Sequence, residues 1–184
     1  MCEILIRDSL RKGREQTILA AGRPPARRWK IAALRGGMEG KTFMLYDHLC
    51  TTIKENESKG DFTYAKATDS MLAEAEANLK LKLPSAYRWF LTRFGQGGIG
   101  GIEVLGIGKN GKLIFVEETL KYRSYGLPAD LILIENCDEW VYCIQTQSGR
   151  IGTWSPGDVK CKDVYESFEV YLWDRINDIL ENRI

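Results

Sequence analysis

The hydrophobic positions between residues 44 and 94 follow the three-to-four-residue spacing of amphipathic helices. The first such segment starts at Met44 and predicts a helix that ends near Gly60. A second helix is expected to begin at Thr68 or Asp69, because either side chain can accept a hydrogen bond from the free N–H groups of a first turn. Its buried positions are Leu72, Ala75 and Leu79, and its outer face carries Glu74 and Glu76.

The third helix is marked at both ends. Pro84 is favoured in a first helical turn, and Gly95 stands where a left-handed residue ends a helix. The buried stripe of this helix is Tyr87, Phe90, Leu91 and Phe94. Trp89 lies beside the stripe and is therefore a candidate for an exposed aromatic side chain that anchors a partner.

From residue 102 onward the apolar runs become strand-sized. Residues 102–107 predict a strand, and Asn110-Gly111 predicts a tight hairpin into a second strand at 113–115. A short helix is expected over residues 116–125. An antiparallel meander follows, with strands at 131–137, 140–146 and 150–154 and turns at Asp138-Glu139 and Ser148-Gly149.

Ser167 is expected to cap a last helix that has a single apolar stripe. The stripe is Phe168, Tyr171, Leu172, Ile176, Ile179 and Leu180, and the outward residues are Asp174, Arg175, Asp178 and Glu181. Helices stand before, between and after the strands, an order that predicts an α+β fold. We therefore expect one domain in which helices pack around a mostly antiparallel, twisted sheet.

The chain of 184 residues has a formal net charge of +1, but its charges are unevenly distributed. Residues 1–43 hold 10 basic and 4 acidic residues, whereas residues 44–184 hold 16 and 21. Because apolar periodicity is weak before Met44, we interpret residues 1–43 as a basic, poorly ordered extension. This extension is an arm for an acidic partner, a tail without function, or the product of a start codon assigned too early.

The side chains that most enzymes and metal sites require are scarce. None of the five cysteines forms a CxxC pair, and His48 is the single histidine, which argues against metal hydrolases and triad enzymes. No cofactor and no metal are therefore expected. We expect His48 on a helix surface, and Cys137 and Cys143 in the core. The absence of a spanning apolar run and of a secretory signal predicts a soluble, cytoplasmic protein.

Two glycine motifs resemble nucleotide-binding signatures in their letters only. Gly95, Gly97 and Gly100 match the dinucleotide fingerprint, but that fingerprint needs a strand before the glycines and a helix after them. Here a helix precedes the glycines, which favours a link that needs positive φ angles. Residues 106–112 spell a phosphate loop but continue with Leu113 in place of Ser or Thr, which favours a hairpin.

Acidic side chains concentrate around the predicted strands, at Glu117, Glu118, Asp130, Glu135, Asp138 and Glu139. Such a cluster can be a solvated surface, or it can contain a carboxylate pair for acid–base catalysis in a small enzyme. A third interpretation is a negative patch that steers a basic protein partner such as a nuclease. Trp140 beside the predicted turn is a second candidate anchor.

The segment 83–91, LPSAYRWFL, resembles the signature of the SUKH superfamily, the Smi/Knr-like immunity domains. The surrounding residues that share the resemblance are Leu72, Glu76, Leu79, Phe94, Gly95, Gly97 and Gly98. Residues 127–138 and 140–146 are similar to the central strands of an antitoxin from this superfamily. The resemblance covers residues 44–184 and implies an α+β immunity domain.

The resemblance implies a non-catalytic protein that binds and neutralises a cognate polymorphic or LXG-type bacterial toxin, often a nuclease. Fungal relatives imply an alternative role as a regulatory scaffold for signalling partners. The resemblance fixes no binding surface, so our expected surface rests on charge and aromatic side chains: Glu117, Glu118, Glu135, Asp138 and Glu139, with Trp89 or Trp140 as anchor. We expect a basic protein toxin as partner, no direct contact with nucleic acid or membrane, and a monomer or weak dimer.

Overall fold

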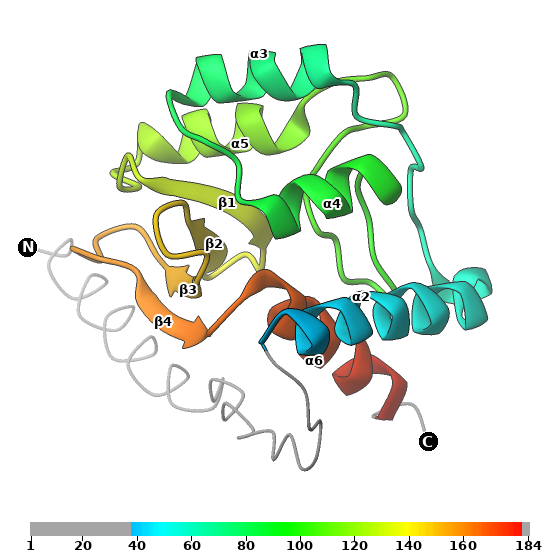
Figure 1. Cartoon of the computed structure of the whole chain (residues 1–184). Coiled ribbons are helices and arrows are strands. Elements are labelled where there is room, and N and C mark those ends of the chain that lie inside the picture. The colour runs from blue at the N-terminus through cyan, green and yellow to red at the C-terminus, as the bar shows by residue number, and fades with distance from the viewer. Residues whose placement is uncertain (1–37, 182–184) are drawn as a thin grey trace, which may run out of the picture. The chain divides into compact units, whose positions relative to one another are not determined.

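The computed structural model describes residues 38–181, with side chains from residue 45 onward (Figure 1). The helices are α2 (Met38–Glu55), the short 3-10 helix η1 (Glu57–Lys59), α3 (Asp69–Leu79), α4 (Ser85–Arg93), α5 (Ile114–Arg123) and α6 (Phe168–Glu181). The strands are β1 (Leu131–Asn136), β2 (Val141–Gln145), β3 (Ile151–Trp154) and β4 (Lys162–Tyr165). These elements confirm the predicted α+β class.

The start of α2 differs from the predicted boundary of the N-terminal extension. α2 begins at Met38, so residues 38–43 are helical and precede the helix start that the sequence predicted at Met44. The rest of the predicted extension, residues 1–37, lies outside the described residues.

The four strands form one antiparallel sheet in the order β1-β2-β3-β4. The first three strands are the predicted meander, and their buried residues are the apolar runs that indicated strands. β4 was not predicted, because it carries no apolar alternation: Lys162 and Asp163 are exposed, and Tyr165 is its one buried residue. Charged residues of this kind are common on edge strands, where they discourage pairing with other chains.

The two short strands predicted around the Asn110-Gly111 turn are wrong. Residues 102–107 make only single bridges, Gly97 with Val104 and Ile107 with Leu113. The turn itself is present: the Gly108 N–H donates to the Lys112 carbonyl at 2.9 Å, and Gly111 has φ +77°. α5 then starts at Ile114, two residues before the expected helix, because the chain turns into a helix directly after the Leu113 bridge.

The helices cover the sheet from two directions (Figure 1). α3 and α5 lie side by side, and α5 packs along β1, while α6 contacts β4 and is itself contacted by α2 and α4. The aromatic rings of the predicted stripes meet between these helices: Tyr87 lies 5.4 Å from both Phe115 and Phe168, and Phe90 lies 5.6 Å from Phe168. The Tyr87 hydroxyl is satisfied by the Leu105 carbonyl at 2.7 Å.

The predicted start of α3, end of α4 and start of α6 are confirmed. Thr68 Oγ1 accepts from the Met71 N–H at 3.2 Å, and Ser167 Oγ accepts from the Val170 N–H at 3.4 Å. Gly95 follows α4 with φ +74°. These contacts satisfy backbone donors that a helix leaves free in its first turn.

Glu76 does not lie in open water on the outer face of α3 as predicted. It is bound by Lys82 at 2.7 Å, by Arg88 at 3.0 Å and by the Leu83 N–H at 3.0 Å. The Lys82 hydrogen bond is the largest of the influences that lower the pKa of this carboxyl. Glu76 therefore joins α3 to the entry of α4.

Glycines in and after the apparent dinucleotide fingerprint allow three chain segments, around Asp61, Gly97 and Gly106, to pack closely. A Cβ atom on Gly97 would lie 1.8 Å from the Asp61 carbonyl oxygen, and one on Gly106 would lie 1.8 Å from the Gly95 carbonyl oxygen. Gly97 also has φ +117°, which L side chains rarely adopt. The glycines of this motif are therefore explained by close backbone packing and by positive φ angles in the link that follows α4.

Candidate protein-binding site

The turn between β1 and β2 presents two of the predicted binding residues to solvent. Asp138 and Glu139 are both exposed. Asp138 has φ +61°, a conformation that aspartate adopts more readily than most residues, and its N–H donates to Asn136 Oδ1 at 3.0 Å. Ser155 Oγ donates to the Glu139 carbonyl at 3.2 Å, which ties the turn to the β3–β4 loop. The two carboxylates thus extend from a turn that is held on both sides.

Glu135 is not part of any exposed acidic surface, which corrects the sequence prediction. Its residue is 3% exposed, and its carboxylate accepts from the Tyr171 hydroxyl at 2.6 Å, from Arg175 Nε at 3.1 Å and from Arg175 Nη2. The cause is a register shift between Leu133 and Glu135, which places Glu135 opposite Tyr142 on the sheet face that meets α6. Arg175, predicted to point outward, is correspondingly drawn into the interface between α6 and the sheet.

The two glutamates of α5 have lysine neighbours. Glu117 is exposed and lies 4.0 Å from Lys112, and Glu118 is bound by Lys121 at 3.1 Å. Among the described residues, no hydrogen bond or ion pair joins these glutamates to Asp138 or Glu139. The predicted acids therefore divide into a buried residue, a pair on α5 and a pair on the β1–β2 turn.

Neither predicted tryptophan anchor stands free in solvent. Trp89 is half-buried, with its ring 4.5 Å from that of Tyr46 on α2 and 5.5 Å from that of Phe94. Trp140 is half-buried against the core. The large apolar side chains that are exposed within the described residues are instead Tyr64, Leu120, Tyr125 and Val159.

The smaller predictions about single residues are confirmed for His48 and Cys143. His48 is exposed on α2, and Cys143 is fully buried in the sheet. Cys137 is half-buried beside Glu135. Its burial, together with the Glu135 charge, raises the pKa of its thiol to about 12.

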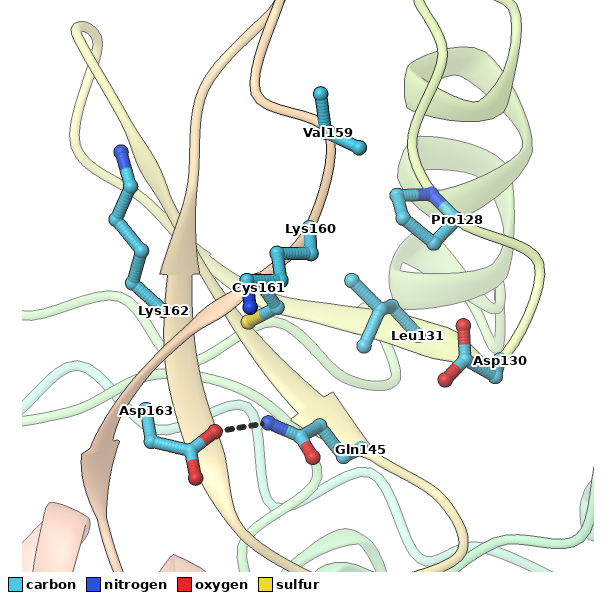
Figure 2. Close-up of a pocket in the computed structure, with 9 residues that line it drawn as sticks. All are labelled: Pro128, Asp130, Leu131, Gln145, Val159, Lys160, Cys161, Lys162 and Asp163. Carbon is cyan, nitrogen blue, oxygen red and sulfur yellow. Dashed lines mark hydrogen bonds between the residues drawn. The ribbon is translucent and has the colours of Figure 1, made fainter.

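An open pocket of about 630 Å³ lies where the start of β1 approaches the segment that leads into β4 (Figure 2). Val159 and Pro128 face each other across the pocket, Leu131 lies below and between them, and Cys161 lies on the Val159 side. The remaining lining residues are Asp130, Gln145, Lys160, Lys162 and Asp163.

The pocket opens on the sheet face that is opposite to α6. Leu131 is the register partner of Gln145, and Cys143 that of Gly152, so these residues share one face. Gly152 leaves room on that face for Cys161. A Cβ atom there would lie 2.4 Å from Cys161 Sγ, which takes the place of a side chain on β3.

The pocket is lined by two carboxylates, Asp130 and Asp163, and by two ammonium groups, Lys160 and Lys162. Asp163 is bound by Arg150 at 2.9 Å and by the Gln145 amide, and Asp158 is bound by Lys162 at 2.7 Å. Asp130 has no hydrogen-bond or ion-pair partner for its carboxylate among the described residues. Burial, followed by the charge of Asp163 and the smaller effects of Asp130 and Asp158, raises the pKa of the Cys161 thiol to about 11.

The sequence of the chain matches the model of a known protein family. The family model SUKH_5, described as SMI1-KNR4 cell-wall, matches residues 47–177. The chain belongs to the SUKH_5 family. The resemblance seen in the sequence is thereby confirmed, and the matched residues of this SUKH protein span the whole sheet and helices α3, α4 and α5.

The fold of this SUKH protein also occurs among solved structures. A crystal structure of a protein from Pseudomonas syringae pv. tomato is 21% identical, with a TM-score of 0.51. The similarity covers 68% of this chain and 94% of that chain. At this level of identity it supports the fold.

The residues that carried the SUKH resemblance serve packing. Tyr87, Phe90 and Leu91 are fully buried, and Gly95 and Gly97 make the close backbone contacts described above. The pocket was missed by sequence reasoning, because Gly152 and Cys161 lie nine residues apart in unremarkable surroundings and Val159 follows a loop. A lone valine between Asp158 and Lys160 gives no pattern from which a pocket rim could be predicted.

The structure also gives information on metal sites and on membrane-spanning helices. Within the part of the SUKH domain that the structure describes, no three His, Cys, Asp or Glu side chains are grouped so as to hold a metal ion. None of the helices described here is both long and apolar enough to cross a bilayer.

Proposed function

We propose that this SUKH protein is an immunity protein, which binds a cognate bacterial toxin of the polymorphic or LXG type and blocks it without catalysis. The observation that carries the proposal is the family match over residues 47–177, because immunity is a frequent role of SUKH domains. The proposed toxin is a basic protein, and a nuclease is the favoured class because its surface must attract phosphate.

The exposed surface gives the proposal physical support. Residues 44–184 hold 21 acidic and 16 basic residues, and Asp138 and Glu139 extend from a turn that two neighbouring segments hold in place. Exposed charges of this kind raise the encounter rate with a partner of opposite charge. A turn that is already rigid loses little conformational entropy when it binds.

Co-expression tests this function. The toxin gene beside the gene for this protein is expressed in a sensitive host with and without the SUKH protein, and surviving colonies are counted. We expect survival only when both proteins are made, and a complex that can be purified from those cells. Cells that die at the same rate with or without the SUKH protein would contradict the immunity function.

Charge reversal tests the proposed contribution of the turn. Asp138→Lys together with Glu139→Lys should slow association with the toxin and flatten its salt dependence, because the steering charges change sign. Glu55→Lys with Glu74→Lys is the matched control, since both residues are exposed and lie on other elements. Equal association rates for the two double variants would remove the turn from the interface.

A regulatory or scaffold role is the second candidate function. The observation that favours it is the description of the matching family, which names SMI1-KNR4 and the cell wall. In that case the protein would recruit signalling partners, and no neighbouring toxin would be neutralised. The third hypothesis, a small enzyme, has less support, because one of the two carboxylates in the pocket, Asp163, is held by Arg150 and Gln145.

A further inference from the structure

The pocket beside β4 has walls that suit an aliphatic chain. Pro128 and Val159 face each other at its mouth, and Leu131 lies between them (Figure 2). Val159 is 95% exposed, so the fold of the described residues leaves an apolar side chain in water at the rim. Lysine and arginine side chains characteristically lay their methylene groups on apolar surface of this kind and keep the charged end in a polar environment.

A positive charge is favoured beside Asp130, an exposed residue of the pocket lining. The charged groups that act most strongly on the Cys161 thiol are three carboxylates, Asp163, Asp130 and Asp158. Of these, Asp130 has no ion-pair partner within the part of the chain that the structure describes, whereas the other two are bound by Arg150 and Lys162. The Lys162 ammonium is engaged with Asp158 and points away from Asp130, and Lys160 is exposed, with its side chain drawn toward Cys161 and away from Asp130 (Figure 2).

The acceptors in the pocket suit a guanidinium better than an ammonium. Asp130 offers two carboxylate oxygens, and Gln145 Oε1 accepts one hydrogen bond, from Ser148 Oγ at 3.2 Å, which leaves a lone pair. A planar guanidinium carries five N–H donors and can reach two acceptors at once. An ammonium is a compact, strongly hydrated charge that loses more on entering a half-apolar pocket.

We propose that this pocket binds an arginine side chain of the protein partner, with its methylene groups between Pro128 and Val159 and its guanidinium at Asp130. The inference rests on the proposed function, since it names a contact that a basic protein toxin would make. It extends the interface to the sheet face opposite α6.

A titration with blocked tripeptides tests the pocket without any toxin. The ¹⁵N-labelled full chain is titrated at low salt with acetyl-Ala-Arg-Ala-amide, and with the same peptide carrying lysine, citrulline or glutamate at the centre. We expect the arginine peptide to shift the amide signals of Leu131, Gln145 and Cys161. The lysine peptide should bind more weakly, and the neutral and acidic peptides should leave these signals in place.

Two variants and one control make the titration decisive. Asp130→Asn keeps the carbonyl that accepts from Thr146 and should weaken binding of the arginine peptide by about two- to fivefold, the value of one exposed ion pair. Val159→Ser, at an exposed position, should weaken it less. Glu139→Gln removes an equal charge from the β1–β2 turn and should change nothing. An absent shift, equal shifts from citrulline or lysine, or unchanged affinity in Asp130→Asn each overturn the inference.

Asp130→Asn also separates this inference from the immunity function. If the cognate toxin binds Asp130→Asn as tightly as the unaltered protein, the arginine contact is excluded while immunity stands. If the unaltered protein fails to bind or neutralise the toxin, immunity fails, and the titration still decides whether the pocket accepts an arginine side chain.

Discussion

The two faces of the four-stranded sheet are built in opposite ways. The face toward α6 is closed by aromatic rings and a buried ion pair, contributed by Tyr142, Tyr165, Tyr171, Glu135 and Arg175. The other face, at β3 and β4, has Gly152 where a side chain would stand and is left with a pocket. One face is thus filled by side chains, whereas the other holds a pocket at β3 and β4.

Two irregularities in strand pairing produce this difference. The shift between Leu133 and Glu135 moves Glu135 onto the α6 face, and the shift between Ile151 and Gly152 lets Asp163 and Tyr165 lie on opposite faces although they are two residues apart. Without the second shift, Tyr165 would share a face with Asp163, and the aromatic cluster over α6 would lose one ring. The bulges therefore sort polar and aromatic residues between the two faces.

The largest effect is expected from breaking the ion pair of the α6 face. Arg175→Ala leaves the buried Glu135 carboxylate without its cation and removes the guanidinium that lies 5.5 Å from the Tyr142 ring centroid. An unpaired buried charge typically costs about 3–5 kcal/mol, so the free energy of unfolding should fall by that amount. Urea denaturation at pH 7 measures the change.

A double variant separates lost charge balance from lost packing. Glu135→Leu with Arg175→Met removes both charges and keeps similar volume, so it should be markedly more stable than Arg175→Ala. A double variant as unstable as the single one would show that shape, not charge, holds α6 to the sheet.

Adding a methyl group at Gly152, on the opposite face, should have the next largest effect. Gly152→Ala places a Cβ atom 2.4 Å from Cys161 Sγ and 2.6 Å from the Lys162 carbonyl oxygen, so β4 must shift. Overpacking of this kind typically costs about 1–3 kcal/mol. Relative to the unaltered protein, Gly152→Ala should increase the hydrogen-exchange rates of the β4 amides more than those of the β1 amides. Adding Cys161→Ala should restore only part of the loss, because the Lys162 carbonyl remains in place.

A smaller effect is expected from the thiols that lie on the two faces. Folding raises the pKa of Cys137 to about 12 and that of Cys161 to about 11, in both cases chiefly through burial. The folded state therefore holds these protons more tightly than the unfolded state does. The resulting stability is complete below the ordinary thiol range and is lost as the pH rises toward these raised values.

Unfolding measured at pH 8 and at pH 10.5 checks this dependence. Cys137→Ala and Cys161→Ala should each lose less stability over that interval than the unaltered protein. Buried tyrosines contribute an alkaline loss of the same sign, but equally in all three proteins, so the difference isolates the thiol. Parallel pH curves for all three proteins would be evidence against the burial of these thiols.

Much of the fold could be predicted because its local signals agree with its packing. Tyr87, Phe90 and Leu91 stand at helical spacing and are all fully buried, and Thr68 and Ser167 cap the helices that they precede. β4 could not be predicted, since an edge strand with one buried residue leaves no alternation.

The candidate site could be predicted only where local geometry decides exposure. A turn must face water, so Asp138 and Glu139 were placed correctly. The position of Glu135 depends on a register shift, and regular alternation would have put it on the face of Leu131 and Leu133. The pocket depends on Gly152 meeting Cys161 across two strands, a tertiary contact that no local pattern indicates.

The smallest change in stability is expected from the exposed ion pair on the pocket face. Arg150 Nε lies 2.9 Å from Asp163, and both side chains are 48% exposed, so Arg150→Ala should change the free energy of unfolding by at most about 1 kcal/mol. The same variant leaves Asp163 bound by Gln145 alone, which makes the pocket more negative. Its affinity for the arginine tripeptide should therefore rise, about twofold at low salt and not at all at high salt.

These two measurements test the contrast between the faces in one protein. If the pocket face is adapted to bind a cation, removing Arg150 improves the binding of the arginine tripeptide and leaves the fold unchanged. If Arg150 instead holds β3 to β4 as Arg175 holds α6, stability falls by several kcal/mol and affinity falls with it. The second result would mean that ion pairs stabilise both faces, and that the pocket is a gap in packing with no role in recognition.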